Sequence, residues 1–250
     1  MTSTADIPPA YQPAVRDSVD STAQEARRLA AAGAEESTLV WAKEQTQARD
    51  WQGKPVESPR GNLYCALVVR PELTLETAAQ LNYVAVVSMG SALASLVSPM
   101  MGLRYRCPNQ ILLNSAVVSE VALHAEANNE QLEWMIIDVR TNVTSHSAAD
   151  EFANTSLATE GCTDVTAEQV LEAFSRQFLS WVSRWSDEDF EPIRKAWMGR
   201  VEDSEFDDTF APPSLVPGNF DSIDERGNIV LKTDKRTKKV SLREFFSLPG

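Results

Sequence analysis

Apolar residues occur in short blocks along the chain, and the length and period of each block predict a strand or a helix. The runs 38–42 and 63–69 are short and bounded by polar residues, which is typical of buried strands. The run 74–97 is long enough for a helix, and Pro99 follows its end. Four more short runs predict strands at about 103–106, 110–113, 116–124 and 133–140.

Helix-start signals lie on either side of this series of strands. Ser21 and Gln24 have the spacing of a capping box, so a helix is expected over 22–32. Thr166 and Gln169 repeat that spacing ahead of a second helix that runs to about residue 185.

A further helix is expected from the polar run 186–189 to Gly199, which has the residue type typical of a helix stop.

The order of these elements predicts an α+β fold: a mixed, largely antiparallel sheet packed with helices, plus a small C-terminal β unit. Residues 1–14 read as a flexible tail and 15–200 as the main domain. Residues 201–219 are acidic and rich in proline, which predicts a linker, and 220–250 would form the β unit.

Charge and composition exclude several classes of function. The chain has 250 residues and a net charge of −13, from 23 basic and 36 acidic residues. A surface this acidic repels phosphate backbones, so we expect no nucleic-acid binding. Its 3 cysteines lack a Cys-x-x-Cys spacing and its 2 histidines have no clustered partners, so we expect reduced thiols and no metal site.

The N-terminus has no basic flank before an apolar run, so no signal peptide is expected. The run Leu81–Val97 is interrupted by polar residues and is too short for a membrane span, so a buried helix is the better interpretation. We therefore expect no membrane association and a cytoplasmic location.

A long polar loop joins the two buried strands that end at Ala42 and begin at Leu63. Rigid strands that flank a loop rich in hydrogen-bonding groups are a common setting for a ligand site. The loop carries Gln45 and Thr46 near its start, Arg49 in its middle, and Gly61 and Asn62 at its end.

On these residues the chain resembles the biotin/lipoate–protein ligase superfamily, and is most similar to the catalytic domain of biotin–protein ligases. The resemblance covers roughly residues 15–200, and the C-terminal segment is weakly similar to the small β domain of biotin ligases. The matching residues follow the family's order, and the resemblance implies that they bind the ligand: Ser21, Thr22, Gln45, Thr46, Gly61, Asn62, Asn109 and Asn142.

The resemblance implies a two-step reaction. ATP with Mg²⁺ would adenylate a carboxylate, and the acyl group would pass to a lysine of a biotin/lipoyl-type carrier domain. Biotin is the expected ligand, ahead of lipoate or octanoate, because the loop is closer to that of biotin ligases. Arg49 and Arg106 would be the catalytic residues that hold phosphates. A homodimer is left open.

The sequence departs from the family where the chemistry needs charge and flexibility. The family's Gly-Arg-Gly-Arg stands here as Ala48-Arg49-Asp50-Trp51. The family also has two motif lysines, of which the first stands here as Arg106 and the second falls at Val117. The glycine that follows this lysine falls at Glu120. Positive donors that face developing negative charge typically contribute about 3–4 kcal/mol each to catalysis, so their loss predicts impaired or altered activation.

Three interpretations follow. The first is a divergent ligase. The second is a non-catalytic module of ligase ancestry that binds a small acid or a carrier protein. The third is an acyltransferase that uses Cys65 or Cys107 as nucleophile, although a buried, structural cysteine is the expected role for each.

Overall fold

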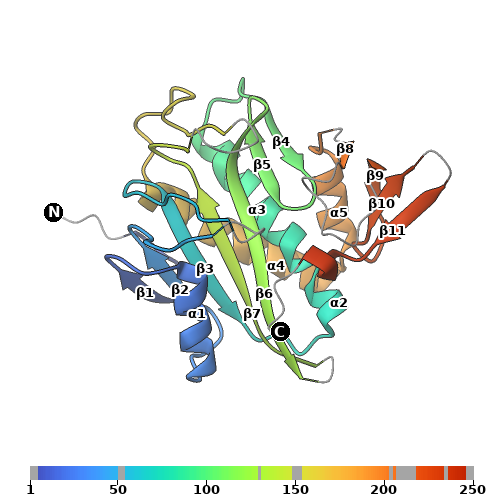
Figure 1. The fold of residues 1–250 in the computed structure, drawn as a ribbon, viewed down its shortest axis with the longest axis horizontal. Coiled ribbons are helices and arrows are strands. Elements are labelled where there is room, and N and C mark those ends of the chain that lie inside the picture. The colour runs from blue at the N-terminus through green and yellow to red at the C-terminus, as the bar shows by residue number, and fades with distance from the viewer. Residues whose placement is uncertain are drawn as a thin grey trace.

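A seven-stranded sheet forms the centre of the protein (Figure 1). The computed structural model describes residues 5–49, 54–128, 131–147, 154–202, 205–206, 218–233 and 236–245. The strand order is β1-β2-β3-β7-β6-β5-β4, and neighbouring strands are antiparallel except for the parallel pair β1 and β2. The strands span Gln12–Arg16 (β1), Thr38–Ala42 (β2), Leu63–Val69 (β3), Leu103–Arg106 (β4), Gln110–Leu113 (β5), Ala116–Asn128 (β6) and Gln131–Thr141 (β7).

Helix α1 (Thr22–Ala31) covers one face of the sheet and contacts β2, β3 and β7. Its small residues Ala26 and Ala30 lie against Val40, Val68 and Ile136, and all five are buried. Because alanine is small, the helix packs closely on the strands. This packing holds α1, and therefore its first turn, in a defined position on the sheet. The start of α1 in turn positions the candidate site described below.

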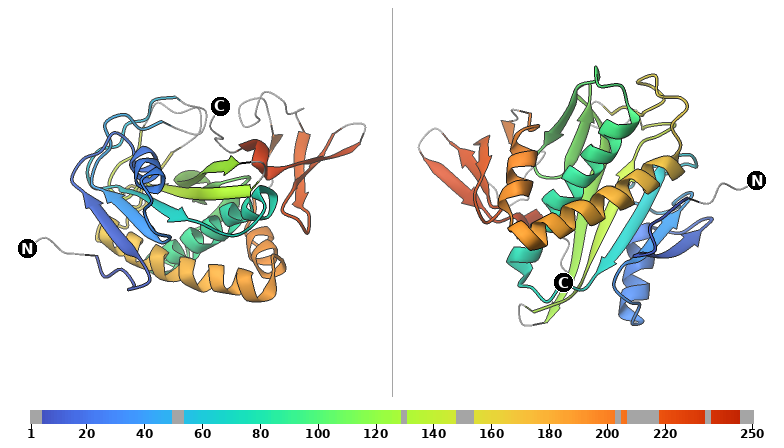
Figure 2. Two further views of the ribbon diagram at one scale, coloured as in Figure 1. Left: turned by 90° about the horizontal axis from the view of Figure 1, so that it is seen from below. Right: turned by 180° about the vertical axis from the view of Figure 1, so that it is seen from behind.

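Helices α3 (Leu81–Leu96) and α4 (Ala167–Glu188) cross the opposite face, as the end-on and rear views show (Figure 2). The main apolar core lies between them and the sheet and includes Met89, Leu93 and Ile137. Gly90 on α3 leaves the space that the Tyr105 ring fills, so a side chain there would collide with the ring.

The helices differ from the sequence expectation in three details. The run 74–97 forms a short helix α2 (Leu75–Ala78) and then α3, rather than one helix. Helix α4 continues to Glu188 and α5 spans Glu191–Met198, so the predicted helix start at 186–189 is wrong. Residues 186–188 are polar and exposed and lie on the solvent side of the amphipathic helix α4. Polar residues of this kind suit a helix start as well as an exposed last turn, so the sequence did not show where α4 ends.

One of the two predicted capping boxes is confirmed. The Thr166 side chain accepts a hydrogen bond from the Gln169 N–H, and the Gln169 side chain accepts one from the Thr166 N–H. Ser21 stands at the N-cap of α1, but its side chain makes no capping hydrogen bond. The capping prediction for Ser21 is therefore wrong, and its hydroxyl is left to face the candidate site.

The segment Leu75–Leu96 is long and apolar enough to cross a membrane by length and composition alone. Most of it is buried against the sheet and against α4, so within the described ranges this apolar helix is part of the core. Its apolar residues therefore serve packing, in agreement with the expectation of a buried helix.

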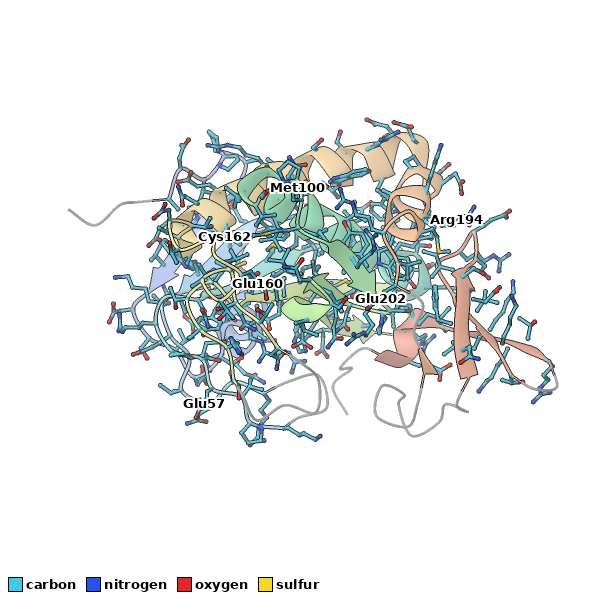
Figure 3. The ribbon with its side chains drawn as sticks, turned by 90° about the horizontal axis from the view of Figure 1, so that it is seen from above. Glu57, Met100, Glu160, Cys162, Arg194 and Glu202 are labelled. Carbon is cyan, nitrogen blue, oxygen red and sulfur yellow. The ribbon has the colours of Figure 1, made fainter. Side chains whose placement is uncertain are left out.

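The C-terminal strands form a separate small antiparallel sheet in the order β11-β10-β9-β8. They span Glu205–Phe206 (β8), Gly218–Ile223 (β9), Ile229–Lys232 (β10) and Thr237–Val240 (β11), and a 3-10 helix η1 (Leu242–Phe245) follows. Phe220 packs edge-on against Trp197 of α5 at 5.6 Å between ring centroids. Arg194, which reaches from α5 to the Ile223 carbonyl, is labelled in Figure 3.

The two ends of the main domain also differ from expectation. Residues 12–14 belong to β1 and pair with β2, although the sequence predicted a tail up to residue 14. The predicted linker over 201–219 lies mostly outside the described residues, and its described part includes β8 and the start of β9.

Candidate functional site

The candidate site lies where α1 begins, above one end of β6 and β7. The loop between β2 and β3 covers it, because Gln45 pairs through its backbone with Val19 and Ser58. Five of the residues expected from the sequence line it, namely Ser21, Thr22, Gln45, Arg49 and Asn109. Further residues from the loop and the strands complete it: Ala48, Val56, Glu120, Val121, Ala122, Asp138, Val139 and Arg140.

Gln45 and Thr22 bind each other. The Gln45 Oε1 atom accepts hydrogen bonds from the Thr22 N–H at 2.8 Å and from the Thr22 hydroxyl at 2.9 Å. The Gln45 Nε2 group faces the Ser58 hydroxyl at 3.3 Å. A glutamine side chain offers one carbonyl oxygen and one NH₂ group, and here both have partners inside the protein. Gln45 therefore has to give up internal bonds before it can bind a ligand.

Asp138 of β7 lies beneath Thr22, whose oxygen is 2.8 Å from the Asp138 Oδ1 atom. The residue is partly buried. Removal of water from around this carboxyl raises its pKa from 3.8 to about 6, and the Thr22 hydrogen bond, Arg140 and Arg27 offset part of that rise. Ionisation of this carboxyl group at the bottom of the site therefore costs free energy.

A second network crosses three neighbouring strands. The register places Gln110 of β5 opposite Glu120 of β6, and Glu120 opposite Arg140 of β7. The Gln110 Nε2 group lies 2.6 Å from the Glu120 Oε1 atom, and the Glu120 Oε2 atom forms an ion pair with Arg140. The side chains of Glu120 and Arg140 are only 18% and 22% exposed, so their charges neutralise each other away from bulk water.

These three residues stand where the resemblance to biotin ligases implies other residue types. Gln110 stands where biotin ligases have an aspartate, and Glu120 where they have a glycine. Biotin ligases also have a Gly-Ile-Gly-Ile-Asn run, which reads Asp138-Val139-Arg140-Thr141-Asn142 here, so Asp138 and Arg140 take the positions of its two glycines. An aspartate at 110 would repel Glu120, so the amide and the carboxylate are compatible only as a pair.

The side chains leave little room. The cavity between the described residues has a volume of about 40 Å³, space for a few water molecules at most. Sites for small organic ligands typically enclose about 300–1,000 Å³. Two carboxyl groups, those of Asp138 and Glu120, also line this cavity. In this arrangement the residues present do not fit biotin together with ATP.

Gly61 and Asn62 hold the loop in place. The Asn62 Oδ1 atom accepts hydrogen bonds from the backbone N–H groups of Val143 and Thr144, both at 2.9 Å. Gly61 has a φ of +99°, and a Cβ there would lie 2.5 Å from the Thr144 hydroxyl oxygen, so only glycine suits this close approach. Neither residue lines the cavity, and both join the loop to the end of β7.

Three other expected residues also point elsewhere. The Thr46 hydroxyl lies 3.2 Å from the Val19 carbonyl, and the Asn142 side chain donates to the Thr155 carbonyl at 3.1 Å. Arg106 is 3.4 Å from the Glu202 carboxylate, and Glu202 is labelled in Figure 3. The structure does not bring Arg106 together with Arg49 at the cavity, so their shared phosphate-binding role stays a prediction.

Arg49 is exposed and lies at the rim of the cavity. Its neighbours Asp50 and Trp51, which mark the departure from the family's Gly-Arg-Gly-Arg, fall outside the described residues. Asn109 is buried, and its side chain donates to the Val121 carbonyl at 2.7 Å. Asn109 therefore supports the wall of the cavity.

The cysteines do not reach the site. Cys65 and Cys107 are each 1% exposed, and burial raises the pKa of both thiols well above the ordinary value. A nucleophilic cysteine needs an accessible thiolate, so the cysteine-dependent acyltransferase is excluded for these two residues. The described parts of the chain also hold no group of three or more His, Cys, Asp or Glu residues that could bind a metal ion.

Sequence reasoning noted Glu120 only as a departure from the family and did not place Glu120, Asp138 or Arg140 together in the site. The signal was available: an aspartate and an arginine two residues apart on an apolar strand must point to the same face. Only the strand register, however, shows that this face is the one beneath α1 and that Glu120 lies opposite Arg140.

The sequence model of the biotin/lipoate A/B protein ligase family matches residues 55–199. The chain is 28% identical over 239 residues to a biotin–[acetyl-CoA-carboxylase] ligase of Paracoccus denitrificans, covering 91% of this chain and 97% of that protein. It is 24% identical over 243 residues to the bifunctional ligase/repressor BirA of Bacillus spizizenii, covering 90% and 70%.

Solved structures share the fold. A biotin protein ligase-like protein of unknown function from Silicibacter sp. TM1040 superimposes with a TM-score of 0.81 at 21% identity, covering 98% of this chain and 100% of that one. The Aquifex aeolicus biotin protein ligase, solved with biotin and ATP, gives a TM-score of 0.73 at 20% identity, covering 92% and 95%. The family match spans more than half of the sequence, so the chain belongs to the biotin/lipoate A/B protein ligase family.

Proposed function

We propose that this member of the ligase family is a non-catalytic module that binds a carrier domain and does not adenylate biotin at the family site. The observation that carries the proposal is the small volume of the cavity, which its own side chains fill. The side chains of Asp138, Glu120 and Arg140 stand where the family has glycines, and about 40 Å³ remains between them and their neighbours.

The way in which the cavity is filled supports a stable alternative rather than a damaged ligase. Glu120 contacts both Gln110 and Arg140 across three strands, and the Thr22 hydroxyl lies within hydrogen-bond distance of both Gln45 and Asp138. The Gln110 Oε1 atom is buried without a partner among the described residues, but the contacts that are made tie three strands together and hold these side chains in one arrangement. The fold as a whole is shared with a ligase-like protein over 98% of the chain, so the site has changed while the fold around it has been kept.

A divergent ligase is the second candidate, and one observation favours it. Arg49 and Arg140 both line the cavity, so two guanidinium groups are within reach of a bound anion. If the Glu120–Arg140 pair opened on binding, ATP with Mg²⁺ could in principle be held by these groups. A cytoplasmic location, with free cysteines and access to carrier proteins, suits either candidate.

The test has a chemical arm and a binding arm. The protein is incubated with ATP, Mg²⁺ and biotin, lipoate or octanoate, and released pyrophosphate is measured, with the Paracoccus denitrificans ligase as positive control. We expect no release above the level without acid. Release with any of the three acids would contradict the proposal and favour the divergent ligase.

In the binding arm, calorimetry measures the affinity of the protein for a biotin/lipoyl-type carrier domain. We expect a complex that forms without ATP and that tolerates replacement of the carrier lysine by alanine. Absence of a complex in both forms would overturn the assignment of a carrier as the partner, while the pyrophosphate result would still report separately on catalysis.

A further inference from the structure

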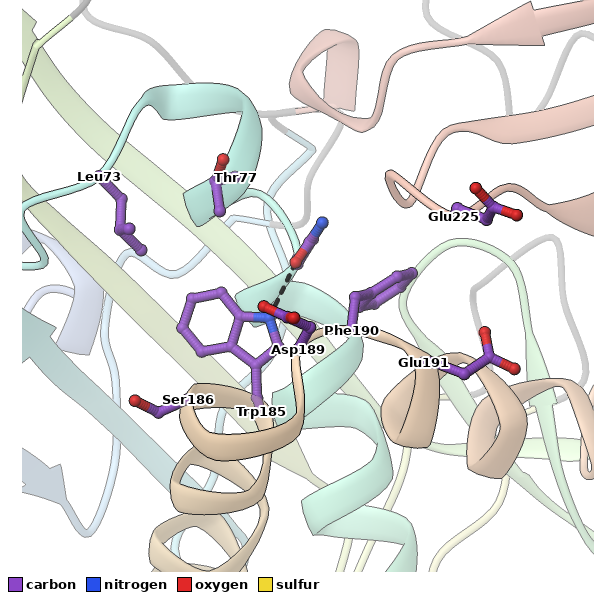
Figure 4. A pocket seen from close by; sticks show the side chains of 9 residues that line it. Leu73, Thr77, Trp185, Ser186, Asp189, Phe190, Glu191 and Glu225 are labelled. Atoms are coloured by element: carbon purple, nitrogen blue, oxygen red, sulfur yellow. Dashed lines mark hydrogen bonds between the residues drawn. The ribbon is translucent and has the colours of Figure 1, made fainter.

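A second and much larger cavity lies on the side of α3, α4 and α5, and it shares no residue with the candidate site. Its volume is about 720 Å³, within the range of small-molecule sites. Three segments enclose it, as Figure 4 shows: the turn around α2, the corner between α4 and α5, and the turn between β9 and β10.

The floor of this cavity is aromatic and rigidly held. Phe190 is only 4% exposed, and the Trp185 indole N–H donates to the Gln80 Oε1 atom at 2.8 Å. The Gln80 Nε2 group in turn donates to the Arg226 carbonyl at 3.1 Å. These bonds fix the indole and tie the C-terminal turn to the main domain, so the walls are in place before any ligand arrives.

The rim of the cavity is acidic. Asp189, Glu191 and Glu225 line it, and all three are exposed. Arg194 pairs with Glu191 at 2.8 Å, and Glu225 adds to the rise in the pKa of Arg194 through space. Within the described ranges Asp189 forms no ion pair or hydrogen bond. Its carboxylate therefore faces the cavity without a cationic partner.

The backbone at Asp189 adds to this picture. Asp189 ends α4 with a φ of +61° and a ψ of −160°, a conformation that residues other than glycine rarely adopt. Strained backbone of this kind is concentrated at sites that hold a ligand or make a sharp turn. Here the strain places the carboxylate next to the aromatic floor, as the close-up shows (Figure 4).

We propose that this cavity binds a small organic cation, an alkyl or aryl amine in its ammonium form. The half-buried Trp185 ring attracts the positive charge, Phe190 adds apolar surface beneath the ligand, and Asp189 and Glu225, which line the same cavity, attract the ammonium group. Anionic ligands such as biotin or ATP are repelled by the same carboxylates. The proposal holds whether or not the protein catalyses the ligase reaction, because no residue of this cavity belongs to the candidate site.

The test uses three probes with the same ring and different charge: phenethylammonium, phenethyl alcohol and 3-phenylpropionate. Binding to the full chain is measured by calorimetry and by tryptophan fluorescence, to which Trp185 contributes as one of the 6 tryptophans of the chain. We expect the ammonium probe to bind about tenfold more tightly than the alcohol, from the cation–π and ion-pair contributions together, and the carboxylate probe not to bind.

Matched variants assign the effect to the cavity. Asp189→Asn combined with Glu225→Gln removes both carboxylates and should weaken ammonium binding about tenfold, and asparagine tolerates the positive φ at 189. Glu188→Gln is the control, because Glu188 is exposed, pairs with Arg184 and does not line the cavity. It should leave the affinity unchanged.

Far-UV circular dichroism checks that each variant is folded, and the two single substitutions replace the double one if it is not. Equal affinity for the ammonium and alcohol probes would overturn the proposal. So would failure of the ammonium probe to bind at millimolar concentration, or unchanged binding in the double variant.

Discussion

Replacing Asp138 by asparagine tests the electrostatics of the candidate site. The folded protein raises the pKa of Asp138 from 3.8 to about 6. A carboxyl whose folded pKa is raised favours the folded state fully below the unfolded pKa, and this advantage is lost as the pH rises through the folded pKa. Asparagine keeps an oxygen that accepts the Thr22 hydrogen bond and does not ionise.

The size of the effect follows from the shift. A difference of about two pKa units corresponds to about 3 kcal/mol, the amount by which Asp138→Asn should exceed the wild type in free energy of unfolding near pH 8. At pH 5 part of this difference is already present, so the gain should grow by about 1.4 kcal/mol between pH 5 and pH 8. His124 and the remaining carboxyls titrate alike in both proteins and cancel in the comparison.

The assay is urea unfolding of both proteins at pH 5, 6, 7 and 8, monitored by tryptophan fluorescence and fitted with a shared m-value. A variant that is less stable than the wild type at pH 8, or a difference that does not change with pH, would refute the reasoning. Either result would mean that Asp138 is ionised in the folded protein without cost, held by Thr22 and Arg140.

The remaining predictions concern positions where the structure makes a specific demand. Glu120→Ala leaves the Arg140 charge partly buried without its carboxylate and should lower the free energy of unfolding by about 2–3 kcal/mol, measured by urea titration; a loss below about 0.5 kcal/mol would show that the pair contributes nothing. Gly61→Ala forces a side chain into a left-handed φ beside Thr144 and should cost about 1–3 kcal/mol in the same assay, and a neutral result would refute the close approach. Thr166→Ala removes a cap and should cost about 1 kcal/mol, whereas Ser21→Ala, whose side chain does not cap α1, should cost less than about 0.5 kcal/mol; equal losses would contradict the difference between the two helix starts.

The sequence predicts the elements of this fold well where periodicity decides and less well at their ends. The strands around Leu63–Val69 and the helix after Thr166 follow from apolar runs and a capping box, and both are confirmed. Strand β1 is missed because its residues are mostly exposed, so its backbone pairing with β2 leaves no apolar pattern. The end of α4 is missed because Asp189 stops it with an unusual backbone angle rather than with glycine.

The candidate site is only half predictable, for a related reason. The family resemblance implies that Ser21, Thr22 and Gln45 bind one ligand, and in the structure these three residues line one cavity. Spacing does not reveal that Glu120 and Arg140 face each other from neighbouring strands, because the pairing depends on the register of β6 against β7. The residues that close the cavity therefore appear only in three dimensions, although each of their positions is a departure visible in the sequence.

The most direct test of the closed site is biotin binding by the wild type and by the variant Glu120→Gly/Arg140→Gly. The double substitution removes both members of the ion pair together and restores the glycines of the family pattern, so neither member is left buried without the other. Calorimetry should detect no biotin binding to the wild type and measurable binding to the variant, with circular dichroism as the check on folding. Biotin binding by the wild type with an affinity equal to that of the folded variant would contradict the claim that these side chains close the site.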